Sequence, residues 1–244
     1  MRSEAVFAQI RVELSLTLRR GESLLVTLAI PLGVLVFFSK LDAVAPSGYN
    51  DPVDFLVPGV ISLAVMSASM VSLGIATGFE RRYGVLKRLG STPLTRIGLI
   101  VAKTVSVLLL QVIQLILILS VATAIGWSIP LAALIALALV LVGSVAFAGI
   151  GLWLAGSLRA EATLALANAL FLIMLFLGGM AYPVEKLPAV LESIAVLSPG
   201  AALSDSLRGV LVSGREFPFD SFLVLCIWAI CAPLIAAKRF RWEE

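Results

Sequence analysis

Histidine is absent from the 244 residues of this sequence, and only 14% of the residues are charged. Without histidine there is no histidine-dependent metal site, Ser-His triad or histidine proton relay, which argues against a membrane hydrolase. We therefore expect no catalytic residue and no metal site. The two cysteines, Cys226 and Cys231, fall within one apolar run, so we interpret them as apolar residues and not as redox groups.

Apolar residues are abundant: they make up 60% of the chain, and the mean hydropathy is +1.08. A soluble domain does not have this composition. About 20 consecutive apolar residues cross a bilayer as a helix. Six runs of this kind are bounded by charges, prolines or glycines: 24–41, 55–79, 97–126, 130–157, 163–181 and 219–237. We predict an all-α membrane protein with six transmembrane helices, forming one domain over residues 1–244.

The distribution of Lys and Arg predicts the orientation, because short basic loops stay on the cytoplasmic side. With the N-terminus inside, thirteen of the 18 Lys and Arg residues face the cytoplasm, and Lys103 falls within the third run. Only Lys40, Lys186, Arg208 and Arg215 remain outside. We therefore expect a multi-pass protein of the cell (plasma) membrane with both termini cytoplasmic. The net charge of +3 reflects this bias, and the sequence has no basic patch interleaved with aromatics that would bind nucleic acid.

A charged segment, residues 79–94, separates the second and third apolar runs. Each of its charges would cost about 2.5–3.5 kcal/mol at the centre of a membrane helix, so we expect the segment at the surface. Tyr83 and Leu86 share one helical side, Arg81 and Arg88 face away, and Pro93 closes the pattern. This spacing fits a short helix that presents a docking surface to a soluble partner. An ordinary basic loop is the alternative.

Two further segments lie outside the apolar runs. Near the N-terminus, Glu13 and Gln9 fall opposite a helical apolar pattern, which predicts an amphipathic helix in the membrane interface or a simple lead-in to the first span. The members of that pattern are Phe7, Ile10, Leu14 and Leu18. Residues 184–194 and 203–211 show two short helical patterns, which fit a pair of half-helices that either dip into the outer leaflet or rest on the outer surface.

Polar side chains within the predicted spans are few. Lys103 and Glu161 lie near cytoplasmic ends, where they could snorkel or meet headgroups, and the centre is uncharged. The missing central carboxylates argue against a proton-coupled or secondary transporter. Gln111, Gln114 and Asn168 are the interior polar residues, for which we prefer interhelical hydrogen bonding over substrate contact.

The order of these features resembles the permease subunits of type-2 ATP-binding-cassette (ABC) exporters over essentially the whole chain. The family's Glu-Arg-Glu-x-Gly-Thr-Leu…Thr-Pro element is similar to Glu80-Arg81-Arg82-Tyr83-Gly84-Val85-Leu86 and Thr92-Pro93. Lys103 stands where the family tends to have a Gly-Lys pair. The family's aromatic-Pro turn before two outer half-helices is similar to Tyr182-Pro183, with Pro199 further on. Arg82, Val85 and Ala102 depart from the family pattern.

The resemblance implies that residues 80–92 form a coupling helix seated in a groove of a separate ABC ATPase subunit. The implied contact residues are Glu80, Arg81, Arg82, Tyr83, Gly84, Leu86, Lys87, Arg88, Thr92 and Pro93. The chain has no Gly-x4-Gly-Lys-Ser/Thr loop, so ATP and Mg²⁺ are expected on the partner and no cofactor on this chain. The family also implies a homodimer, or a heterodimer with a second permease.

These observations predict a transport subunit and not an enzyme: the permease half of an ATP-driven exporter. Apolar walls suit a hydrophobic or amphipathic cargo, such as a drug-like or lipid-linked molecule. A non-transporting membrane anchor or sensor for an ATPase is the alternative.

Overall fold

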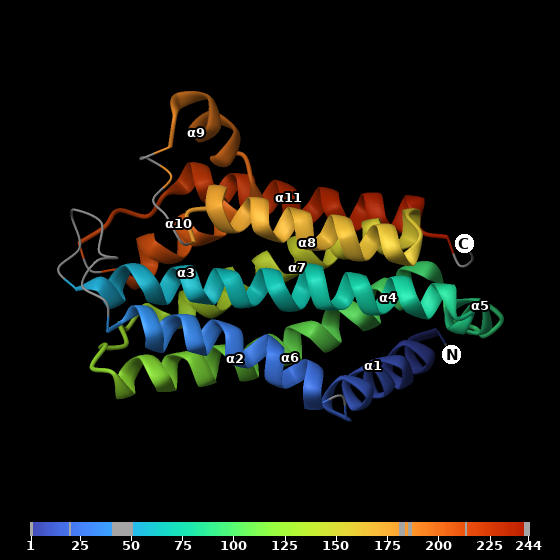
Figure 1. Ribbon diagram of the computed structural model, residues 1–244. Helices are drawn as coiled ribbons and strands as arrows, with labels where there is room; N and C mark the ends of the chain where they lie inside the picture. Colours follow the sequence, from blue (N-terminus) through green and yellow to red (C-terminus); the bar gives the residue numbers. More distant parts are fainter. Residues whose placement is uncertain are drawn as a thin grey trace.

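The computed structural model describes residues 2–19, 21–40, 51–180, 184, 187–212 and 214–241, and its regular elements are all helices within these ranges. They form an elongated bundle (Figure 1). The elements are α1 (Arg2–Arg19), α2 (Gly21–Phe38), α3 (Pro52–Met66), the π-helix η2 (Ser67–Ser72), α4 (Leu73–Arg82), α5 (Val85–Gly90), α6 (Arg96–Ala124), α7 (Ala133–Ser157), α8 (Ala160–Leu177), α9 (Ala189–Ala195), α10 (Pro199–Leu211) and α11 (Phe219–Arg239).

Five helices in the described part of the chain are long and apolar enough to cross a membrane, which confirms an all-helical membrane protein. They are Pro52–Arg82, Arg96–Ala124, Ala133–Ser157, Ala160–Leu177 and Phe219–Arg239, close to the last five predicted spans. The first predicted span, 24–41, overlaps α2, whose apolar part in the described residues is the shorter Thr27–Phe38. The six-span layout therefore stays a prediction.

The two ends of the bundle differ in what they carry. The start of α1, the short α5 and the end of α11 lie at one end, which we call the α5 end, whereas α9 and the end of α10 lie at the other, the α9 end (Figure 1). Side chains fix where the long helices begin. Asp51 accepts a hydrogen bond from the Val53 amide at the start of α3, and Thr95 accepts one from the Gly98 amide at the start of α6.

α7 lies at the centre of the packing and contacts α3, η2, α4, α6, α10 and α11. Glycines permit two of its closest contacts. A Cβ added to Gly149 would lie 2.5 Å from the Pro233 nitrogen of α11, and one added to Gly151 would lie 2.6 Å from the Met70 carbonyl oxygen of η2. Helices approach this closely only where small residues line the interface.

The N-terminal helix forms as predicted, and the side that carries Glu13 packs against the bundle. Glu13 is buried against α6, whereas Phe7 and Leu18 are exposed. Glu13 is buried because it finds a cationic partner, Lys103, on α6. That α1 lies in the membrane interface stays a prediction.

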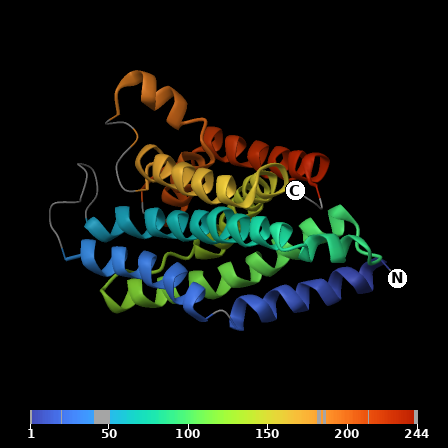
Figure 2. The same cartoon turned by 45° about the vertical axis from the view of Figure 1, so that its right-hand side comes forward.

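The two short helices near the α9 end behave differently. α9 stands away from the bundle (Figures 1 and 2), whereas α10 is buried among α3, α7 and α11 and so dips into the bundle. Pro199 is buried in the first turn of α10, and Tyr182 and Pro183 of the same predicted motif lie outside the described residues. Trp228 donates a hydrogen bond to the Leu197 carbonyl at 3.0 Å. Because Trp228 is near the middle of α11, about 13 Å from its start, the α9–α10 junction reaches that depth.

Arg208 of α10 is one of the four cations that we expected on the outer side of the membrane. The side chain is buried, and its guanidinium lies 4.3 Å from the centre of the Phe55 ring. It also donates a hydrogen bond to the Gly179 carbonyl and pairs with Asp205. A delocalised guanidinium stacks well on an aromatic ring, so this position holds α10 against α3.

Candidate functional site

We predicted that residues 80–92 form one helix lying across the surface. The structure shows two separate helices instead. Glu80, Arg81 and Arg82 continue the long second span as the last turn of α4. Gly84 then turns the chain with a φ of +70°, and the separate helix α5 follows. Glycine adopts this left-handed backbone without steric cost, which explains the break between α4 and α5. Residues 73–90 thus form a helical hairpin at the α5 end.

Glu80 forms a buried ionic cluster with Lys103 and Glu13. The Lys103 Nζ lies 2.6 Å from Glu80 Oε2 and 2.8 Å from Glu13 Oε1, and the Lys103 side chain is only 1% exposed. We had suggested that Lys103 could snorkel to the headgroups. It does not, because two carboxylates pair with it inside the bundle. The cluster lines a small crevice of about 50 Å³ between α1, η2, α4 and α6. A lysine within an apolar run indicates a buried acidic partner. Its position in the sequence did not identify Glu13 as that partner.

Arg81 and Arg82 hold the end of α4 against the α7–α8 turn. Arg81 is 4% exposed, and its guanidinium donates a hydrogen bond to the Leu158 carbonyl at 2.6 Å. Our expectation that Arg81 faces away from the protein was wrong, because the carbonyls that α7 leaves unpaired at its end attract a cation. Arg82 pairs with Glu161 at the start of α8, where both side chains are partly exposed.

The hairpin beyond Arg82 is anchored by Leu86, with Leu89 half-buried beside it, and most of its other side chains face outward. Leu86 is fully buried against Leu94, Leu99 and Phe240. Tyr83, which we expected on the same side, is 69% exposed. Further exposed residues of this segment are Val85, Lys87, Arg88, Gly90, Ser91, Thr92 and Pro93. The hairpin therefore presents a tyrosine and two cations on a surface fixed to three helices.

Two of the three predicted interior polar residues form hydrogen bonds between helices, which is the role that we preferred for them. The Gln111 Nε2 of α6 donates to the Val65 carbonyl at 3.3 Å and to Ser69 Oγ at 3.1 Å. Gln114 Nε2 donates to the Thr27 carbonyl of α2 at 3.4 Å. Both glutamines are buried, so their hydrogen bonds lie within the bundle.

We had predicted Asn168 to be an interior residue, and this prediction was wrong. It lies on the exposed face of α8, and its Nδ2 donates to the Leu164 carbonyl of its own helix. In the described part of α8, only Ala160, Thr163 and Ala167 are buried. Apart from Glu161 in its first turn, the other residues of the helix are apolar and either exposed or half-buried, so Asn168 is a polar group among apolar neighbours.

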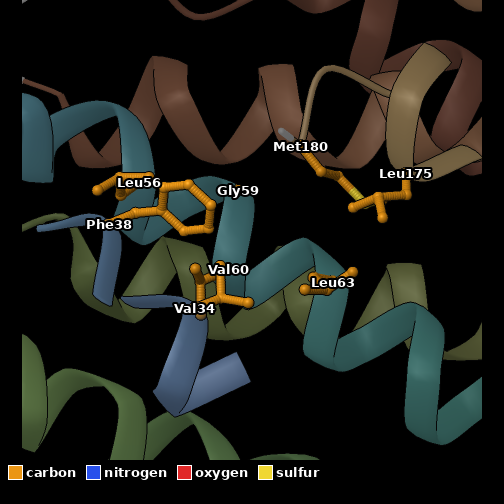
Figure 3. Close-up of a pocket in the computed structure, with 8 residues that line it drawn as sticks. All are labelled: Val34, Phe38, Leu56, Gly59, Val60, Leu63, Leu175 and Met180. Atoms are coloured by element: carbon orange, nitrogen blue, oxygen red, sulfur yellow. The ribbon is translucent and has the colours of Figure 1, made fainter. Parts of the chain in front are cut away.

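An apolar pocket lies on the α9-end half of the second span (Figure 3). Its lining comes from α2, α3, the end of α8 and Met180: Val34, Phe38, Leu56, Gly59, Val60, Leu63, Leu175 and Met180. The Met180 and Leu175 side chains point toward each other on one side of the pocket, with Phe38 on the other (Figure 3). Its volume of about 60 Å³ is space for about two water molecules, and every lining side chain is apolar or absent.

Comparison with known proteins assigns the family. The model of the ABC-2 type transporter family matches residues 4–212. The chain belongs to this family. It is also similar to the ABC transporter G family member 20 of Dictyostelium discoideum, with 23% identity over 220 residues that cover 86% of this chain. The chain spans 30% of the length of that relative.

Membership of the ABC-2 type transporter family places the observed features in a transport context. The chain is a membrane-spanning permease component of the ABC-2 type. The matched residues include the Glu80 hairpin, the Lys103 cluster, both glutamines and α10. The family match therefore covers the whole of the candidate site.

Proposed function

We propose that this ABC-2 type permease is the membrane subunit of an ATP-driven exporter. A separate ATPase subunit would bind and hydrolyse ATP with Mg²⁺, and this chain would move a hydrophobic or amphipathic molecule out of the cytoplasm. The observation that carries the proposal is the second span, Pro52–Arg82. One half of this span lines the apolar pocket, and its other end carries the charged hairpin.

The hairpin supports docking to a soluble subunit. Leu86 is buried and so gives α5 a fixed seat, while Tyr83 and Arg88 are exposed beyond the spanning helix. An aromatic side chain and a cation are groups that protein interfaces favour. The Glu80–Lys103 pair and the Arg81–Leu158 bond would then transmit movement of α5 into the bundle.

The pocket supports an apolar cargo. A charged cargo would need compensating groups along its path, whereas the lining is apolar throughout. In the described conformation the space admits only the end of an apolar group, such as a branch or the tip of an acyl chain. The pocket would therefore widen when α2, α3 and α8 move apart.

The exposed face of α8 supports pairing with a second permease, either another copy or a similar chain. Lipid alone would leave the Asn168 amide without a partner outside its own helix. A facing permease, or a substrate pathway between two permeases, would meet both the apolar residues and this polar group. In this arrangement the α5 end faces the cytoplasm, because the basic residues gather there.

The experiment that tests the subunit assignment is co-purification followed by ATP hydrolysis in nanodiscs. We expect the chain to hold an ABC ATPase through detergent extraction and to raise the ATPase rate above that of the soluble subunit. If no ABC ATPase binds the intact chain, the assignment to a two-subunit transporter is wrong. Hydrolysis that is stimulated without any movement of lipophilic probes would favour the anchor or sensor.

A further inference from the structure

The second span is interrupted near its middle by the π-helix η2. Its wider turn pairs amides with carbonyls five residues back, as in the bond from the Leu73 amide to the Ala68 carbonyl. The helix is α-helical on both sides, in α3 and α4. π-turns inside α-helices are rare and gather at functional sites, because the extra residue breaks the regular bonding pattern.

Gln111 of α6 holds the first part of this π-turn. Its Nε2 donates to the Val65 carbonyl, just before η2, and to the Ser69 hydroxyl oxygen within it. The side chain is 1% exposed, so water does not compete for these bonds. The backbone bonding pattern changes where the π-turn begins, and there the Gln111 amide supplies the Val65 carbonyl with a donor from a neighbouring helix.

The opposite side of η2 lies directly on the backbone of α7. Gly151 meets the Met70 carbonyl, and Gly74 just beyond η2 meets the Gly151 carbonyl, with no room for a side chain at either glycine. The π-turn is thus clamped between a hydrogen-bonding glutamine and a flat glycine surface. Neither contact interlocks side chains, so a change of pairing at η2 has to repack mainly the Met70 side chain, which is fully buried in the main hydrophobic cluster.

The segments on either side of η2 have different attachments. α3 lines the apolar pocket, and Gly59 packs against the Met180 backbone. α4 is tied to α6 by Glu80–Lys103 and to the α7–α8 turn by Arg81. A movement of one half relative to the other must therefore be absorbed between them, and η2 is where the helical bonding is already altered.

We infer that η2 is the joint of the second span and that Gln111 is the positioning residue that fixes it in the conformation described. The π-turn holds one residue more than a regular α turn, and each residue added to or removed from a helix turns the remainder of that helix by about 100°, so a change between π and α pairing at η2 would turn one half of the span relative to the other. The pocket wall and the hairpin would then change orientation relative to each other. This inference rests on the proposed function, because it assigns the joint to the transport cycle.

Hydrogen exchange of the chain with its co-purified ATPase in nanodiscs tests the inference. The variant is Gln111→Leu, which removes both hydrogen bonds at similar volume, and the matched control is Gln114→Leu, one turn along α6 and bonded to α2. We expect amides of residues 67–73 to exchange roughly 3- to 10-fold faster in Gln111→Leu, the effect of losing one or two buried hydrogen bonds. We expect the control to match the unchanged chain in this segment.

Two further readouts separate a joint from a merely structural glutamine. In the unchanged complex, addition of ATP should alter exchange in residues 67–73. Gln111→Leu should also lower lipophilic-dye transport per ATP hydrolysed at least threefold, and a purely structural role would lower both rates together. Ser69→Ala, which keeps the Val65 bond, should fall between.

The outcomes distinguish this inference from the proposed function. If the unchanged complex transports dye but exchange in residues 67–73 ignores ATP, or if Gln111→Leu and Gln114→Leu behave alike, the joint is overturned and the exporter stands. If the unchanged complex shows no ATP-dependent transport at all, the exporter itself fails, and the joint fails with it.

Discussion

Lys103 and Glu80 lie on different helices, and their Nζ and Oε2 atoms are 2.6 Å apart inside the bundle. Glu13 completes the cluster from α1. The pair therefore ties the end of the second span, which leads into the exposed hairpin, to the third span and the N-terminal helix. A hairpin held in this way moves together with three helices and not alone.

Replacing Lys103 should destabilise the protein, because the carboxylates of Glu13 and Glu80 would stay buried without a cation. We expect Lys103→Met to lower the free energy of unfolding by about 3–5 kcal/mol, because an ion pair that loses one member leaves uncompensated charge. The measurement is thermal unfolding in detergent. The control is the triple variant Glu13→Gln, Glu80→Gln, Lys103→Met, which removes all three charges and should recover part of the loss. A triple variant no more stable than Lys103→Met would show that the ionic cluster is not the cause.

Surface variants of the hairpin should separate docking from folding. Tyr83→Ala and Arg88→Glu change exposed side chains, so we expect unfolding within about 0.5 kcal/mol of the unchanged chain but weaker binding and stimulation of the ATPase. Leu86→Ala, by contrast, empties a fully buried site and should cost about 2–5 kcal/mol. Binding assays and thermal unfolding on the same preparations make the comparison. Full ATPase stimulation by both surface variants would rule out docking through this face.

The close contact between η2 and α7 should not tolerate a methyl group. Gly151→Ala places a Cβ 2.6 Å from the Met70 carbonyl oxygen, so we expect a loss of about 1–3 kcal/mol of stability. Gly33→Ala in α2 is the control, since no atom lies within 4 Å of its added Cβ. That variant should be neutral or stabilising by up to about 1 kcal/mol, because alanine is the better helix former. Equal effects at the two positions would contradict the packing described.

Single-cysteine labelling should show the orientation. In a background without Cys226 and Cys231, a cysteine at exposed position 88 should react with an impermeant reagent only from the cytoplasm, and one at exposed position 215 only from outside. The reason is the gathering of basic residues at the α5 end. Position 208 is unsuited to this test because Arg208 is buried. Labelling of position 215 from the cytoplasm would contradict the six-span arrangement.

The sequence predicted the helices well because an apolar run of membrane length has few other solutions. The runs at 97–126 and 219–237 correspond to α6 and α11 within a few residues. The π-turn at residues 67–72 could not be predicted, because π and α pairing use the same apolar residues. The break at Gly84 was missed for a related reason: helical spacing continues through the glycine, and only its φ reveals the turn.

The geometry of the candidate site differs from the predicted one at two residues, and its role in docking stays a prediction. Arg88 lies on an exposed surface as expected, but Tyr83 is exposed and does not share the buried side of Leu86, and Arg81 turns inward because a carbonyl of Leu158, 77 residues further on, accepts its hydrogen bond. No local pattern identifies a partner for Trp228, whose indole nitrogen donates to the Leu197 carbonyl. Such contacts join distant positions, so they depend on the packing of helices and not on local spacing.

The most direct test of the exporter is transport in proteoliposomes that contain this chain and its ATPase. The probes are a short-chain fluorescent phospholipid and an uncharged lipophilic dye, added with ATP on the side of the hairpin. We predict ATP-dependent movement of at least one probe to the other side, which persists with a protonophore and stops when the catalytic residue of the ATPase is mutated. Probe movement by this chain alone, driven by a pH gradient, would contradict the account.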